Sequence, residues 1–148
     1  MTAWVFVARA VSHGTTRDEE YARAIERLVA GGGYGVRLGG SATPGEPMAK
    51  LVAQNINAVA QAAVLVAVLP ESTETISSVW LEIGIAFAAA RPMVIVAWTG
   101  TELPFLVLAS ADASPKRTVV VPAASTAHET AQAVLNSIRE IPYAGPTT

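Results

Sequence analysis

The chain contains no cysteine and only two histidines, His13 and His128, among its 148 residues. The absence of cysteine excludes disulfides and thiolate chemistry, and two histidines so far apart argue against a histidine metal cluster. Charged residues make up 15% of the chain and the formal net charge is −2. A basic surface of the kind that binds nucleic acid is therefore not expected. We expect neither a metal nor a cofactor.

Long apolar runs are also missing, although 51% of the residues are hydrophobic. No segment of about 18 uninterrupted apolar residues is present, so we expect no membrane span. Residues 3–8 lack a basic leader and are interpreted as a first strand rather than a signal peptide, which gives a cytoplasmic expectation. The GxSxG, HExxH and Cys–His patterns are absent, which removes the commonest serine, zinc and cysteine hydrolase mechanisms.

Short apolar runs alternate with segments of helical character along the whole chain. The runs predict strands, and the segments between them carry capping residues and apolar residues at helical spacing. Such alternation is typical of a doubly wound, mainly parallel five-stranded sheet in a Rossmann- or flavodoxin-like three-layer sandwich. We expect one domain over residues 1–141 and a loose tail over 142–148. Ligands of such folds bind beyond the carboxyl ends of the strands, which directs attention to residues 9–16, 38–46, 70–78 and 99–103.

Glu82 is the most informative residue, because it is the only charged residue between Glu74 and Arg91. It lies in the first turn of a predicted helix over residues 79–90, where the helix dipole favours an anion. An isolated carboxylate among apolar neighbours is costly to bury unless something compensates it. Glu82 is therefore a candidate nucleophile or general base. The alternative is a glutamate that only stabilises the start of the helix.

Asn55 is the second candidate. Met48, Val52, Asn55 and Val59 follow helical spacing, which predicts that Asn55 shares the apolar face of a helix over residues 47–62. A buried amide needs hydrogen-bond partners, so Asn55 could bind a ligand or orient Glu82. A core asparagine bonded to backbone is the alternative. The opposite, solvated face is predicted to carry Lys50, Gln54, Asn57 and Gln61.

The loop after the first predicted strand contains small and charged residues ahead of a helix. This arrangement could cradle a phosphate, with charge supplied by Arg9 or His13. As a motif it is weak, because it is neither a Walker A loop nor GxGxxG. The residues proposed to contact substrate here are Arg9, Ser12, His13 and Gly14.

Two features of residues 77–80 complete the candidates. Ser77 or Ser78 is predicted to cap the helix that carries Glu82, and the same hydroxyls could instead face a sugar or phosphate. Trp80 could offer a stacking surface for a base, with buried packing as the alternative.

Taken together, residues 55–67, 80–88 and 91–96 resemble the nucleoside 2-deoxyribosyltransferase superfamily, and the resemblance extends over about residues 3–122. That superfamily includes the 2'-deoxynucleoside 5'-phosphate N-hydrolases and the CMP hydrolases of antibiotic pathways. The Glu82-Ile83-Gly84 element is its most specific part. The spacing from Ala8 to Tyr21 is similar to the phosphate loop and first helix of the N-hydrolases, which adds Tyr21 to the substrate-binding candidates.

The resemblance implies roles for these residues. Glu82 takes the place of the glutamate that attacks the anomeric carbon, and Asn55 takes the place of an acidic residue that assists the base. Ser77 and Ser78 occupy the loop that contacts sugar or phosphate. Gly84 would allow close approach of a ligand or a neighbouring chain. A homodimer or larger homo-oligomer, in which a neighbouring subunit completes the pocket, is also implied.

The sequence departs from the family at three places. Asn55 replaces a carboxylate and cannot donate a catalytic proton. The first loop has Arg9-Ala10-Val11 where a glycine is usual, and Ser78-Val79 replaces a glycine-threonine pair. The favoured hypothesis is an N-glycoside hydrolase that acts on a nucleoside 5'-monophosphate. The alternatives are a nucleoside (deoxy)ribosyltransferase that exchanges bases, and a non-catalytic nucleotide-binding or assembly protein on the same fold.

Overall fold

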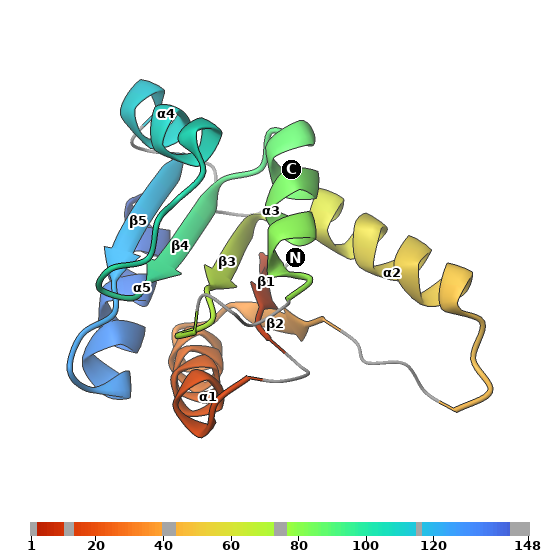
Figure 1. Ribbon diagram of the computed structural model, residues 1–148, viewed down its shortest axis with the longest axis horizontal. Coiled ribbons are helices and arrows are strands. Elements are labelled where there is room, and N and C mark those ends of the chain that lie inside the picture. The colour runs from red at the N-terminus through yellow and green to blue at the C-terminus, as the bar shows by residue number, and fades with distance from the viewer. Residues whose placement is uncertain (1–2, 11–13, 40–43, 73–76, 115–116, 143–148) are drawn as a thin grey trace.

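The computed structural model describes residues 3–10, 14–39, 44–72, 77–114 and 117–142. Strands and helices alternate along the chain as the sequence predicts (Figure 1). The strands are β1 (Trp4–Ala8), β2 (Gly35–Leu38), β3 (Val64–Val68), β4 (Met93–Ala97) and β5 (Thr118–Pro122). The helices are α1 (Thr16–Gly31), α2 (Met48–Gln61), α3 (Val79–Ala88), α4 (Phe105–Ala113) and α5 (Ala127–Glu140).

The five strands form one sheet in the order β2-β1-β3-β4-β5, and every neighbouring pair is parallel. This confirms the doubly wound, flavodoxin-like prediction. Burial on both faces of the sheet explains the continuous apolar runs. All five residues of β3, for example, are buried. The strand order reverses between β1 and β3, which is where ligands of such folds bind.

Alternate residues of each strand face two separate cores. Val5 and Val7 pack with α1 and α5 on one face of the sheet, whereas Phe6 and Ala8 pack with α2, α3 and α4 on the other. The sheet thus lies between two helical layers (Figure 1). In one layer, α1 and α5 pack closely against each other. The other layer contains α3, the helix that carries Glu82.

Helix caps follow the predicted chemistry with one shift. Thr16 and Glu19 have the spacing of a capping box, but the box that forms lies one residue earlier: the Thr15 hydroxyl accepts from the Asp18 amide at 3.1 Å, and the Asp18 carboxylate accepts from the Thr15 amide at 2.9 Å. Thr126 and Glu129 have the same spacing, and there Thr126 caps α5 by accepting from the Glu129 amide at 3.2 Å. Gly33, with φ of 93°, lies just beyond the end of α1, as the glycine run predicts.

The predicted buried stripe of α2 is wrong over its first half. Met48 is 61% exposed and Val52 is 46% exposed, whereas Val59 is fully buried. The reason is tertiary: the first turns of α2 extend beyond the sheet, and only its C-terminal half packs against β1 and α3 (Figure 1). Helical spacing identifies the apolar stripe but not how much of the helix reaches the core.

The exposed large hydrophobic residues of the described chain all lie on one helical layer. They belong to α2, α3 and α4, and α1 and α5 contribute none. Among the described helices, none is both long and apolar enough to cross a membrane. The residues are Met48, Val52, Ile56, Trp80, Leu81, Phe87, Phe105, Leu106 and Leu108.

Candidate functional site

Glu82 is a buried carboxylate without a full set of partners. It lies in the first turn of α3, beyond the carboxyl end of β3, and is only 5% exposed. Its Oε2 is buried and has no hydrogen-bond partner within the described residues. Burial raises the pKa of Glu82 from 4.5 to about 7, because desolvation penalises the charged form. A carboxylate of this kind is suited to chemistry near neutral pH.

Gly39, just after β2, leaves room for that carboxylate. A Cβ atom at this position would lie 3.1 Å from Oε1 of Glu82 and 3.6 Å from the Phe6 ring. Glu82 therefore reaches across the carboxyl edge of the sheet toward β1 and β2, which is the side of the strand-order reversal. The sequence indicated residues 38–46 as a ligand loop but gave no reason to single out Gly39 or Phe6.

Asn55 lines a neighbouring cavity of about 470 Å³. The same cavity is lined by Phe6 and Leu38, so it begins beside the Glu82 carboxylate. Asn55 is half-buried, and no described residue forms a hydrogen bond with its side chain. Its amide is thus available to a ligand. Gln54, Asn57 and Gln61, which line the outer part of the cavity, are exposed as predicted.

Arg9 lies at the entrance to the loop that follows β1. With Gly14 it lines a cavity of about 240 Å³. Its Nε is buried and unpartnered among the described residues, and its Nη1 lies 4.0 Å from Oε1 of Glu19. Ser12 and His13, the other candidates of this loop, lie outside the described residues.

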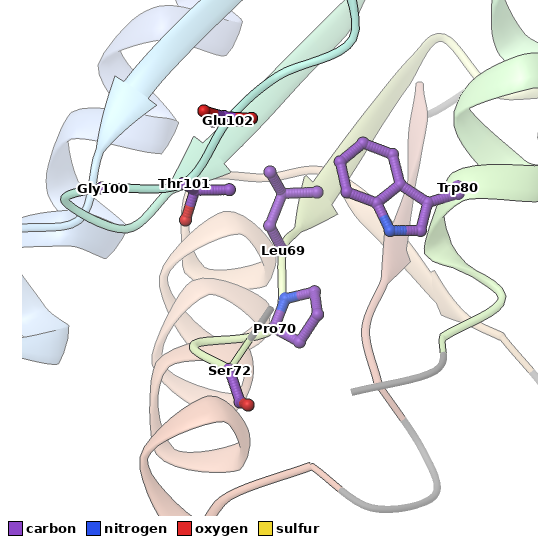
Figure 2. A pocket seen from close by; sticks show the side chains of 7 residues that line it. All are labelled: Leu69, Pro70, Ser72, Trp80, Gly100, Thr101 and Glu102. Atoms are coloured by element: carbon purple, nitrogen blue, oxygen red, sulfur yellow. The ribbon is translucent and has the colours of Figure 1, made fainter. Parts of the chain in front are cut away.

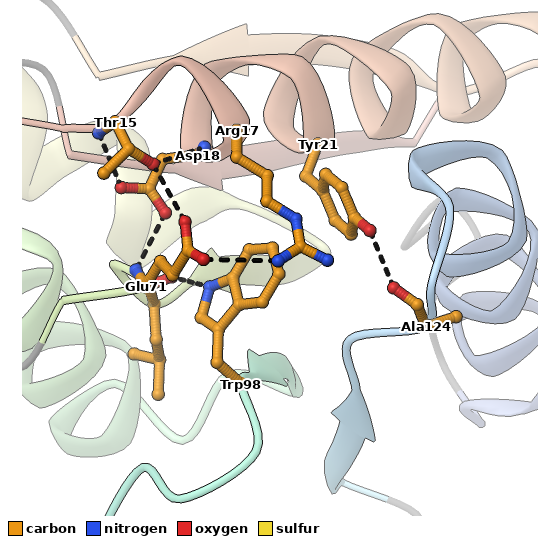
Figure 3. Close-up of polar contacts among 8 residues, drawn as sticks. Thr15, Arg17, Asp18, Tyr21, Glu71, Trp98 and Ala124 are labelled. Carbon is orange, nitrogen blue, oxygen red and sulfur yellow. Dashed lines mark hydrogen bonds and ion pairs between the residues drawn. The ribbon is translucent and has the colours of Figure 1, made fainter.

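The start of α1 is occupied by the protein's own carboxylate. Asp18 is 4% exposed and accepts hydrogen bonds from the Thr15 amide at 2.9 Å and the Glu71 amide at 2.8 Å. The second bond ties α1 to the segment after β3 (Figure 3). The Asp18 carboxylate already offsets the positive end of the α1 dipole, so a phosphate bound beside it would need a cation such as Arg9.

Ser77 and Ser78 precede the Glu82 helix as predicted. Ser78 occupies the N-cap position, but its hydroxyl forms no capping bond. The Ser77 hydroxyl instead accepts from the Val79 amide at 3.2 Å. Ser77 thus stabilises the helix start, and the exposed Ser78 hydroxyl is the one left to meet a ligand.

Trp80 faces a different cavity from the one beside Asn55. It points into a space of about 390 Å³ between the segments that follow β3 and β4, together with Pro70, Thr101 and Glu102 (Figure 2). Trp80 and Glu82 are two residues apart on one helix, which directs their side chains to different sides. A planar ring could stack on Trp80, which is 37% exposed, but Asn55 does not line that cavity.

Tyr21 is part of the core. It is 2% exposed, its hydroxyl donates to the Ala124 carbonyl at 2.7 Å, and its ring centroid lies 4.7 Å from that of Trp98 (Figure 3). The Arg17 guanidinium covers Trp98 at 4.8 Å and pairs with Glu71 at 3.2 Å. No cavity reported above is lined by Tyr21. The sequence offered Tyr21 as a substrate-binding candidate and did not reveal the aromatic and cationic cluster around it.

No group of three or more potential metal ligands occurs within the part of the chain that the structure describes. The polar groups that the candidate residues offer to a ligand are the Glu82 carboxylate, the Asn55 amide and the Arg9 guanidinium.

No protein-family model matches the sequence, and no curated protein matches it. Solved structures share its fold. The CMP N-glycosidase BcmB of Clostridium botulinum has 11% identity and a TM-score of 0.59, over 88% of this chain and 96% of the other. A conserved protein from Enterococcus faecalis has 14% identity and a TM-score of 0.60, over 95% and 99%.

A flavodoxin-like domain from Synechococcus has 16% identity and a TM-score of 0.55, over 93% of this chain and 94% of that domain. At these identities the likenesses show the fold alone. The fold and the similar solved structures define the chain as a doubly wound α/β protein of flavodoxin-like topology. Its architecture is similar to that of a CMP N-glycosidase.

Proposed function

We propose that this chain is an N-glycoside hydrolase that cleaves the base from a nucleoside 5'-monophosphate, with Glu82 as the nucleophile. One observation carries the proposal: Glu82 is a buried carboxylate with an unpartnered oxygen and a pKa raised to about 7, at the carboxyl edge of the sheet. The architectural likeness to a CMP N-glycosidase supports the same chemistry.

The reaction would proceed in two displacements at the anomeric carbon. Ionised Glu82 attacks C1', and the base departs with the electrons of the C1'–N bond and takes a proton from water. Water then attacks C1' of the glycosyl ester, which releases the sugar phosphate and restores the carboxylate. A carboxylate nucleophile thereby divides one difficult step into two easier ones. Desolvation would make ionised Glu82 a stronger nucleophile than an exposed carboxylate.

The cavity beside Phe6 and Asn55 would receive the base. Phe6, which lines it, lies beside Gly39 as the Glu82 carboxylate does, and the cavity is large enough for one base. The Asn55 amide can both donate and accept hydrogen bonds, but it cannot protonate a leaving group. Turnover is therefore expected to be slow, and to improve when a carboxyl group is placed at this position.

Arg9 would meet the 5'-phosphate. Its buried Nε lacks a partner in the described chain, and a charge-assisted bond to phosphate would satisfy it. Glu19, 4.0 Å from Arg9, and Asp18 reduce the positive potential of this loop. Arg9 is therefore the cation that we propose for the phosphate.

A second candidate, a non-catalytic nucleotide-binding protein, is favoured by two specific observations. Asn55 lacks an acidic proton, and the Asp18 carboxylate places a negative charge at the start of α1, where it accepts from the Thr15 amide. A protein of this kind would bind the same nucleotides beside Glu82 without turnover. Binding would raise the melting temperature, since a ligand that binds only the folded state stabilises it.

The proposal includes association with a second copy through the α2–α3–α4 layer. Nine large apolar side chains of this layer are at least 37% exposed, and removing apolar surface from water is the main driving force of protein association. We expect Phe105→Glu, at an 80% exposed site, to lower the mass measured by light scattering, and Asn136→Glu on α5 to leave it unchanged.

The direct test is chromatography of free base after incubation with nucleosides and their 5'-monophosphates. Wild type is expected to release base from at least one of them, and Glu82→Gln to lose more than a hundredfold of that rate. Glu140→Gln, at the end of α5, removes an exposed carboxylate away from these cavities and serves as the matched control. A Glu82→Gln variant with wild-type activity would exclude the mechanism.

Two further arms separate the other hypotheses. Addition of a second free base would produce an exchanged nucleoside if the chain were a transferase. Thermal stabilisation by a monophosphate without base release would favour the binding protein.

A further inference from the structure

A second polar cavity lies at the opposite edge of the sheet from Glu82. It occupies about 190 Å³ beside Met93 and Thr118, the first residues of β4 and β5, which are register partners. Glu82 follows the carboxyl end of β3, whereas this cavity lies at the amino ends of β4 and β5. The cavity and Glu82 are therefore at opposite ends of the strands. The cavity is lined by Phe87, Arg91, Ser110, Ser114, Arg117 and Thr118.

Every charged residue that lines this cavity is basic. Arg91 and Arg117 contribute two guanidiniums, and no acidic residue is present in the lining. Neither arginine forms an ion pair with any described residue. Arg91 Nε is buried and without a hydrogen-bond partner in the same part of the chain. A buried donor without a partner is costly, which indicates that something else satisfies it.

The ends of the neighbouring helices do not neutralise the two arginines. α3 and α4 both end near the cavity, and each C-terminus carries about half a negative charge at most. Two guanidiniums exceed that sum by about one positive charge. The carbonyl of Ser114, the residue that follows α4, also bonds locally, because it accepts from the amides of Arg117 and Thr118 at 2.9 and 3.0 Å. The excess positive charge is therefore left for an anion.

Neutral donors and an aromatic ring complete the cavity. The hydroxyls of Ser110 and Thr118 lie 2.8 Å apart, and one of them retains a proton to donate elsewhere. Ser114 adds a third hydroxyl to the lining. Phe87 is 48% exposed beside the arginines, so an apolar group attached to an anion would find a surface there.

We infer that this cavity binds a phosphate-class oxyanion, held by Arg91 and Arg117. Guanidinium groups form paired, charge-assisted hydrogen bonds to tetrahedral and carboxylate oxygens. The buried Nε of Arg91 gains a partner, and the hydroxyls supply further donors. The oxyanion is either free phosphate or the phosphate of a monoester whose apolar part lies on Phe87. This site is independent of base cleavage at Glu82.

The test is titration of the full chain with inorganic phosphate, followed by calorimetry. Arg91→Gln and Arg117→Gln are each expected to weaken binding at least about tenfold, the effect of one lost charged hydrogen bond. Arg139→Gln makes the same charge change on exposed α5 and should leave the affinity within about twofold of wild type. Arg117 is exposed, so its variant keeps the test valid if Arg91→Gln fails to fold.

Further arms identify the source of the oxyanion and separate this site from Glu82. Phenyl phosphate is expected to bind more tightly than inorganic phosphate if a monoester is the ligand, and equally if free phosphate is. Glu82→Gln should not change either affinity. The inference is overturned if no binding occurs up to about 10 mM phosphate, where a millimolar site is largely occupied, or if both arginine variants bind like wild type. It is also overturned if the variants only dissociate an oligomer, because the arginines would then pair with carboxylates of a second copy.

Discussion

Gly39 and Glu82 come from segments on either side of the β1–β3 reversal, yet a single Cβ atom on Gly39 would lie 3.1 Å from the Glu82 carboxylate. This spacing is tighter than ordinary van der Waals contact. The absence of a side chain on Gly39 therefore gives Glu82 its place at the sheet edge.

Gly39→Ala is expected to displace the Glu82 carboxylate. We predict at least about a tenfold loss of base release, since small misplacements of a reacting group are costly, with a stability change of about 1 kcal/mol or less. Gly31→Ala, where an added Cβ meets nothing within 4 Å, is the matched control. Equal activity of the two variants would show that the position of Glu82 is not set by Gly39.

Burial of Glu82 makes stability depend on pH. Its folded pKa of about 7 lies above the ordinary 4.5, so the folded chain keeps a proton that the unfolded chain releases. The contribution of Glu82 to the free energy of unfolding is then complete below about pH 4.5, and it falls by up to about 3 kcal/mol as the pH rises to about 7. Glu82→Gln lacks this loss, and its advantage over wild type in urea unfolding should grow between about pH 5 and pH 8. A constant difference across that range would contradict the raised pKa.

The same pKa governs the rate if Glu82 is the nucleophile. Only the ionised carboxylate attacks, so kcat/KM for base release should rise about tenfold per pH unit below pH 7 and level off above it. A profile that falls through pH 7 would instead assign Glu82 the role of a general acid. Initial rates at constant ionic strength distinguish the two.

Tyr21 is expected to matter for stability and not for substrate. Tyr21→Phe removes the 2.7 Å bond to the Ala124 carbonyl and leaves that half-buried acceptor without its partner, at a cost of about 1 kcal/mol. The KM for any nucleotide substrate should stay within about twofold. Tyr34→Phe, which removes a hydroxyl outside this cluster, is the comparison. A large rise in KM would restore Tyr21 to the binding site.

Ala90 follows α3 with φ of 54°, the backbone region that favours glycine. The Arg91 amide bonds back to the Ala86 carbonyl at 2.8 Å, which closes the helix end. Ala90→Gly should therefore stabilise the chain by about 1 kcal/mol. Ala53→Gly, at an exposed position inside α2, should destabilise it by a similar amount. If both changes are destabilising, the left-handed turn at Ala90 is not the conformation in solution.

The sequence by itself determined the alternation of strands and helices, the parallel sheet and most of the helix caps. Each of these depends on residues within a few positions of one another, such as the buried run of β3 or the bond between Thr126 and Glu129. It also indicated Glu82, because one charge within an apolar helix is visible without any fold. Its catalytic role remains a prediction.

The tertiary structure alone decided which residues surround Glu82 and which helix faces are covered. Gly39 and Glu82, or Tyr21 and Ala124, are far apart in the chain, and no local pattern records their approach. Met48 and Val52 have the spacing of core residues but are exposed, because burial depends on whether another element lies opposite. Arg91 and Arg117 share a cavity only because β4 and β5 pair in register.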